Sequence, residues 1–161
     1  NRTVADLADQ TTEEFLTALG SRFPITQNGS PEPQKGQISM YVAGAWYGID
    51  FGPLCSAIRA EGEGLVKQLD VAILQEHVLA PLLSVKDIRT DPRVAFVGGS
   101  RGTAALEQAV DSGAAEAAFS LAAVTPSELL AISDAGDIMP PKSTWFEPKL
   151  RDGLLTHRFL S

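Results

Sequence analysis

Cysteine and histidine are scarce in this sequence of 161 residues, which contains only Cys55, His77 and His157 of these two types. A single thiol cannot form an internal disulfide, and the three side chains do not have the spacing of a metal site. Long apolar runs are also lacking. Charged residues interrupt the most apolar stretch, residues 66–83, so it does not provide the ~18 consecutive apolar residues that a membrane-spanning helix needs. We therefore expect no disulfide, no metal site and no membrane span.

Basic charge is in deficit as well. The chain has 13 Lys and Arg against 20 Asp and Glu, a net charge of -7, and its acidic residues are spread along its length. Surfaces that bind nucleic acid concentrate Lys and Arg, so we expect no nucleic-acid partner. Residues 1–4 have neither the basic region nor the apolar run of a signal peptide, which favours a cytoplasmic protein. Because position 1 is Asn rather than Met, we expect residues 1–161 to be a single domain that forms the C-terminal part of a longer chain.

The first half of the sequence predicts two helices and a β-hairpin. Residues 11–20 combine a hydroxyl cap, an acidic first turn, an apolar face and a terminal glycine, which is the pattern of a short helix. Residues 38–51 alternate around a central Ala-Gly pair, which indicates two antiparallel strands joined by a tight turn. Apolar residues at helical spacing predict the longest helix over residues 65–79, and Pro81 limits its continuation. Residues 26–36, which contain proline and glycine, predict an exposed loop.

The second half predicts alternating strands and helices. A strand over residues 93–97, a glycine-rich loop, a helix over residues 103–110 and a strand over residues 117–122 form a β-loop-α-β unit. A further helix begins after Thr125 with a cap, a proline and an early acid. We therefore predict an α+β fold: a mixed β-sheet with an N-terminal β-hairpin, flanking helices and the β-loop-α-β unit. The hairpin and the longest helix are expected to share one core.

A proline-fixed loop at residues 140–146 carries the strongest candidate site. Its Lys142, Ser143 and Thr144 place a cation beside two hydroxyls, and the pre-ordered backbone reduces the entropy lost on binding phosphate or carboxylate. The loop is not a Walker A motif, because the proline before the lysine has no N–H to offer a phosphate. A packed structural loop whose lysine faces solvent fits the same residue types equally well. The aromatic residues 145–146 are expected to hold the loop against the core.

Three further features are weaker candidates. Residues 98–102 lie between a predicted strand and a predicted helix, where backbone amides attract anions and Arg101 would add a bidentate charge, although a tight connection needing positive φ is favoured. Asp70 and His77 lie two helical turns apart, about 10 Å, and cannot pair directly. The two side chains could still line a shared pocket, but a histidine with satisfied hydrogen bonds at a helix boundary is favoured. For Cys55, a buried and inert thiol is favoured over a nucleophile.

Four segments of the chain form a recognisable pattern. They are Asn1-Arg2-Thr3-Val4, residues 69–74 (Leu-Asp-Val-Ala-Ile-Leu), residues 96–99 (Phe-Val-Gly-Gly) and, above all, residues 134–150, whose Met-Pro-Pro-Lys-Ser-Thr motif is specific. In these segments the chain resembles a bacterial and archaeal family catalogued as domain of unknown function 1015. The resemblance spans nearly the whole chain.

The resemblance implies a larger protein, because full-length members carry an upstream Asp-Gly-His-His-Arg motif similar to that of ParB-like and free-serine-kinase proteins. Some relatives are regarded as ATP-dependent kinases of free L-serine. The expected function is therefore the C-terminal domain of a small-molecule kinase, whose upstream half would be its partner and would supply the catalytic groups and any site for ATP and Mg²⁺. Lys142, Ser143 and Thr144 would bind the phosphate or carboxylate of a small anionic or amino-acid ligand, with Arg101 and Lys149 as supporting cations. A non-catalytic ligand-binding or assembly domain is the alternative.

Overall fold

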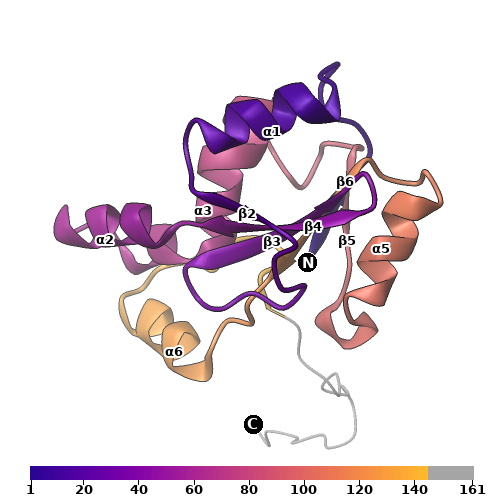
Figure 1. The fold of residues 1–161 in the computed structure, drawn as a ribbon. Helices are drawn as coiled ribbons and strands as arrows, with labels where there is room; N and C mark the ends of the chain where they lie inside the picture. The colour runs from indigo at the N-terminus through magenta and orange to yellow at the C-terminus, as the bar shows by residue number, and fades with distance from the viewer. Residues whose placement is uncertain (145–161) are drawn as a thin grey trace, which may run out of the picture.

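A computed structural model of the protein describes residues 1–144, and their strands form one sheet (Figure 1). The strand order is β2-β4-β3-β6-β1-β5, and every neighbouring pair is antiparallel. In the view of Figure 1, α1 and α3 lie above the sheet, α6 lies below it and α5 lies beside its right-hand end. The elements are β1 (Arg2–Val4), α1 (Thr12–Gly20), β2 (Ile25–Gln27), β3 (Gln37–Val42), β4 (Ala45–Asp50), α2 (Gly52–Ala60), η1 (Leu65–Gln68), α3 (Asp70–Leu74), η2 (Gln75–Leu79), α4 (Ala80–Leu83), β5 (Val94–Phe96), η3 (Gly99–Arg101), α5 (Ala104–Asp111), β6 (Ala117–Leu121) and α6 (Pro126–Asp134).

The predicted α+β class and the predicted hairpin are confirmed. β3 and β4 pair along their full length. Ala43 and Gly44 join them with φ of 48° and 78°, the positive values that a tight hairpin turn of this kind needs at both central residues. β2 adds a third strand beside β4. Most of this strand lies in a segment predicted to be a loop, since three residues are too few to show a periodic pattern.

The β-loop-α-β unit has a different pairing from the one expected. β5 and β6 run parallel to each other, but β1 lies between them and is antiparallel to both. This corrects the expectation of a mixed sheet, since no parallel strands are hydrogen-bonded neighbours among residues 1–144. β1 itself was not predicted. Its three residues are all buried because strands pair with it on both sides, which a short local sequence cannot reveal.

The longest helix begins and ends later than predicted. Residues 65–68 form the separate turn η1, because the extended conformation of Leu69 (φ -72°, ψ 136°) interrupts the helix there. From Asp70 to Leu83, α3, η2 and α4 follow one another without a gap, and we call them helix 70–83. Pro81 lies in the first turn of α4, directly after the π-helical segment η2. The wider π turn moves away the carbonyl that the proline ring would meet in a regular helix.

Helix starts follow the local sequence more closely. α1 and α6 both begin with a capping box, in which Thr11 pairs with Glu14 and Thr125 pairs with Glu128, as the sequence pattern predicted. α2 was not predicted. Leu54 and Cys55 pack against the core beside Ile58, its one buried residue, but this apolar stripe covers a single turn and is too short to show a period.

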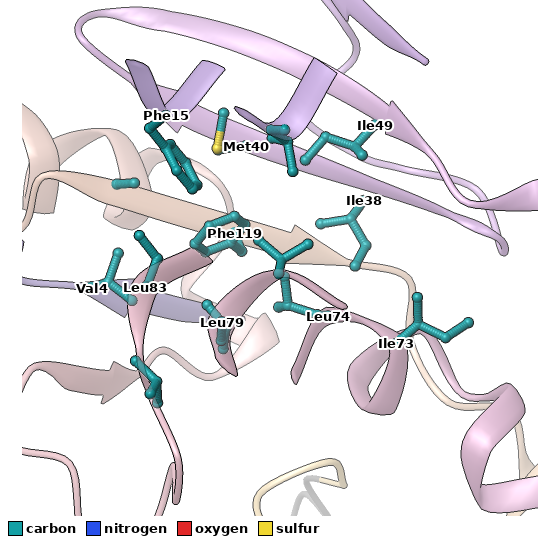
Figure 2. Packing of buried hydrophobic residues seen from close by; sticks show 14 of the residues in the cluster. Val4, Phe15, Ile38, Met40, Ile49, Ile73, Leu74, Leu79, Leu83 and Phe119 are labelled. Atoms are coloured by element: carbon teal, nitrogen blue, oxygen red, sulfur yellow. The ribbon is translucent and has the colours of Figure 1, made fainter. Parts of the chain in front are cut away.

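The main core lies on one face of the sheet. Inward residues of the strands, such as Val4, Ile38 and Phe119, pack with Phe15 of α1 and with Leu74 of helix 70–83. Figure 2 shows these side chains gathered in one cluster between the strands and the helices. The hairpin and helix 70–83 therefore share one core, as expected.

The opposite face of the sheet holds α5. Tyr41 and Trp46 have ring centroids 5.1 Å apart and pack with Leu106 of that helix. Trp46 Nε1 donates a hydrogen bond to Glu107 Oε1 at 2.7 Å, and the Tyr41 hydroxyl donates to Asp111 Oδ1 at 3.1 Å. These contacts fix the helix that follows the glycine-rich loop, and so they fix the end of that loop.

Candidate functional site

A cavity of about 810 Å³ lies where the carboxyl ends of β5 and β6 flank the start of β1. The first residues of helix 70–83, the start of α6 and residues 142–144 border it as well. Segments from both ends of the described chain therefore meet in one cavity. Its lining is Asn1, Arg2, Lys35, Asp70, Val71, Phe96, Val97, Gly98, Gly99, Ser100, Leu121, Ala122, Ala123, Val124, Thr125, Pro126, Leu129, Lys142, Ser143 and Thr144.

Arg2 is the buried cation of this cavity. Only 3% of its surface is exposed, because β1 is enclosed between two strands. Its Nη2 donates to the carbonyl oxygen of Pro141 at 3.3 Å, and its guanidinium carbon lies 5.6 Å from the centroid of the Phe96 ring. Among residues 1–144 no carboxylate forms an ion pair with it, and its Nε has no hydrogen-bond partner.

This environment destabilises the charge of Arg2 without removing it. Burial lowers the pKa of the guanidinium from 12.5 to about 10, so Arg2 stays protonated at neutral pH. A buried charge without a partner is costly, and an anion placed beside it would offset that cost. Arg2 is therefore the residue of this cavity best suited to hold an anionic group.

The predicted loop contributes its residues to the same cavity. Lys142, Ser143 and Thr144 all line it, and Lys142 has a left-handed backbone with φ of 54°. Ser143 Oγ donates to the carbonyl oxygen of Pro140 at 2.6 Å, which closes the loop on itself. The bond from Arg2 to Pro141 ties the loop to β1, and in Figure 1 the yellow end of the described chain passes close to the N-terminus.

A third cation stands at the cavity on a different segment. Lys35 precedes β3, and its Nζ lies 2.9 Å from Glu128 Oε2 in α6. The same Glu128 oxygen accepts hydrogen bonds from the backbone N–H and the hydroxyl of Thr125, so the capping box of α6 also positions the lysine. These bonds, together with the charge of Lys35, hold the pKa of Glu128 below its usual value although its partial burial acts in the opposite direction.

Asp70 is the acidic member of the lining among the described residues. It is the first residue of helix 70–83 and only 5% exposed. Its Oδ1 accepts a hydrogen bond from the backbone N–H of Gly36 at 3.0 Å. Burial raises the pKa of this carboxyl, while the bond from Gly36 and the charge of Lys35 act against that rise.

The cavity combines charge with an apolar wall. Among the described residues of the lining, Arg2, Lys35 and Lys142 are basic and Asp70 is acidic, in a chain whose net charge is -7. Larger apolar side chains also line the cavity, and they are Val71, Phe96, Val97, Leu121, Val124 and Leu129. Apolar walls with a few placed polar groups are typical of small-molecule sites, and a local excess of positive charge in an acidic protein attracts anions.

The outcome for the predicted residues is uneven. The structure brings Lys142, Ser143 and Thr144 together with the glycine-rich loop, whose Gly98, Gly99 and Ser100 also line the cavity. Arg101 is exposed and does not belong to the lining. Lys149 lies outside the described residues, as do the two aromatic residues expected to hold the loop.

Sequence reasoning assigned no binding role to Arg2 and Lys35, and it considered Asp70 only for a pocket shared with His77. Arg2 and Asp70 both fall in segments on which the expected resemblance rests. The residue types alone do not reveal a role, because a surface arginine or aspartate is common and only tertiary packing buries these two. Lys35 had no signal of its own within a predicted loop.

The remaining candidates lie elsewhere. His77 lines a second cavity of about 390 Å³ with Arg22 and Asp50, so that Asp70 and His77 do not share a pocket. Cys55 is half-buried, and burial raises the pKa of its thiol, which fits the inert cysteine that the sequence favoured. Residues 1–144 contain no cluster of His, Cys, Asp and Glu suited to a metal ion. Their helices are also too short or too polar to cross a membrane.

Comparisons with known proteins add no relative to this picture: no family model, curated protein or solved structure matches the chain.

Proposed function

We propose that this chain is the C-terminal domain of an ATP-dependent small-molecule kinase of the free L-serine type, and that its cavity binds an anionic group of the ligand. The observation that carries the proposal is Arg2, a buried and protonated arginine without a carboxylate partner among residues 1–144. Lys142, Ser143 and Thr144 line the same cavity, where hydroxyls and an ammonium would complete the contacts to phosphate or carboxylate.

In such an enzyme these residues would position the substrate and stabilise its charge. Phosphoryl transfer depends mainly on positioning and on electrostatic stabilisation of the transferred group, which cations and hydroxyl donors supply. The upstream half of the parent protein would bring ATP, Mg²⁺ and the catalytic groups, in the cytoplasm. The 161 residues alone are therefore expected to bind the ligand and to show no turnover.

The alternative, an assembly domain, would display a large apolar patch and lack a concave polar site. The charged cavity supports ligand binding instead. A ligand-binding domain without catalysis shares the same cavity, and the two are separated by assaying the full-length parent for ATP-dependent phosphorylation of L-serine.

Isothermal titration of the chain with L-serine and with inorganic phosphate tests the binding step. Lys142→Ala should weaken the binding of whichever of these probes the wild type binds by roughly ten- to a hundredfold, since a charge-assisted hydrogen bond contributes about 1.5–3 kcal/mol. Lys86→Ala serves as the matched control, because Lys86 is exposed and lies outside the cavity lining. Equal affinities for wild type and Lys142→Ala would show that the loop is architectural, and a wild type that binds neither probe would refute the proposal.

A further inference from the structure

Asp70 has one carboxylate oxygen in use and one without a partner. Oδ1 accepts the N–H of Gly36 at 3.0 Å, whereas no donor among residues 1–144 reaches Oδ2. The residue is only 5% exposed and belongs to the cavity lining. A buried carboxylate oxygen without a donor destabilises the folded protein, so this arrangement is unfavourable for the protein by itself.

The surroundings do not neutralise Asp70. Lys35 is the cation that acts on its charge, but the lysine is held by Glu128 at 2.9 Å. The start of helix 70–83 provides a partial positive charge, and the single bond from Gly36 provides one donor. A purely structural need to hold the Gly36 amide would be met by a neutral asparagine or serine. The charge of Asp70 is thus unexplained by its contacts within the described chain.

Arg2 presents the complementary situation in the same cavity. It is buried, positively charged and without a carboxylate partner among residues 1–144, while Asp70 is buried, acidic and only half satisfied. We propose that Asp70 is a specificity-determining residue of this cavity, whose free Oδ2 accepts a hydrogen bond from a protonated amine of a ligand whose anionic group binds at Arg2. This inference rests on the proposed function and adds to it the residue that binds the cationic end of the ligand.

The charges of Arg2 and Asp70 also determine which ligands the cavity rejects. A purely anionic molecule would satisfy Arg2 but would meet the carboxylate of Asp70, and a purely cationic amine would meet the three basic side chains. A hydroxyl in place of the amine would give Oδ2 a donor and would leave its charge without a counter-charge. The cavity therefore favours a small dipolar molecule with both groups.

Two pairs of probes that differ only in the amine test this assignment by titration calorimetry. L-serine and 3-hydroxypropionate share a carboxylate, and 2-aminoethyl phosphate and ethyl phosphate share a phosphate, so that the two pairs also distinguish the source of the anionic group. In at least one pair, the wild-type chain should bind the amine-bearing member about ten- to a hundredfold more tightly. Asp70→Asn should reduce this preference to less than about threefold, because it weakens the binding of the amine-bearing member and removes the repulsion that the carboxylate exerts on the amine-free member.

Controls separate this inference from the proposed function. Arg2→Met should weaken both members of the pair, and Asp9→Asn, an exposed aspartate outside the cavity, should change neither. Asp70→Ser, which keeps a small acceptor for Gly36, provides a second variant, and thermal unfolding verifies that each variant is folded. If Asp70→Asn and Asp70→Ser keep the preference for the amine-bearing member, or if their affinities for both members fall equally, the role assigned to Asp70 is wrong while the anion site stands. If the wild type binds no member of either pair, both proposals fail.

Discussion

Replacing Arg2 by methionine should stabilise the protein and weaken its affinity for anions at the same time. Burial lowers the pKa of Arg2 from 12.5 to about 10, a difference that corresponds to a destabilisation of about 3 kcal/mol. Against this stand the long hydrogen bond to Pro141 at 3.3 Å and the contact with the Phe96 ring, each contributing about 1 kcal/mol. Methionine has a similar volume and no charge, so the free energy of unfolding should rise by about 1 kcal/mol.

The pH dependence of this gain follows from the direction of the shift. Arg2 is protonated in both the folded and the unfolded chain below pH 10, so the penalty is constant there and the gain should persist across the neutral range. As pH rises through about 10 toward 12.5, the folded wild type loses the proton first, the penalty fades, and the advantage of Arg2→Met should shrink.

Urea unfolding at neutral pH and titration with the anionic probes measure the two effects on the same samples. Arg101→Met is the matched control, because Arg101 is exposed and outside the cavity lining, and it should alter the unfolding free energy by less than about 0.5 kcal/mol. A loss of more than about 1 kcal/mol in Arg2→Met, with anion affinity intact, would refute the reasoning and make Arg2 a structural residue.

Two further predictions concern the stability of the fold outside the cavity. Gly29→Ala should lower the free energy of unfolding by about 1–3 kcal/mol, because its Cβ would lie 2.4 Å from the backbone nitrogen of Gly48. Gly48→Ala should be tolerated, since its Cβ would meet nothing closer than 3.8 Å. Urea unfolding of both variants checks this asymmetry. Asp87 has its pKa lowered from 3.8 to about 2 by the side chain of Arg89, so its stabilising contribution is present above pH 4 and is lost as pH falls through 2. Asp87→Asn should accordingly be less stable than wild type at neutral pH and equal to it below pH 2 in unfolding experiments, and a constant difference at all pH values would contradict this.

Local features of the fold could be predicted from the sequence because their causes are local. The capping boxes at Thr11 and Thr125 join residues three positions apart, and the turn at Ala43-Gly44 needs only its own backbone conformation. The lysine, serine and threonine of residues 142–144 could likewise be singled out by type and by the stiff backbone that holds them. Patterns of this range do not depend on what the rest of the chain does.

The site itself was decided by tertiary structure. Arg2 and Lys142 are far apart along the chain, and they meet because β1 inserts between β5 and β6, an order that no local pattern contains. The same insertion buries Arg2, and the packing at the start of helix 70–83 buries Asp70. Burial is what makes these two charges costly and lowers or raises their pKa, and it depends on every segment that excludes water from them. The sequence alone therefore determined which side chains were present and which short elements formed, while long-range strand pairing determined which charges face one another without partners.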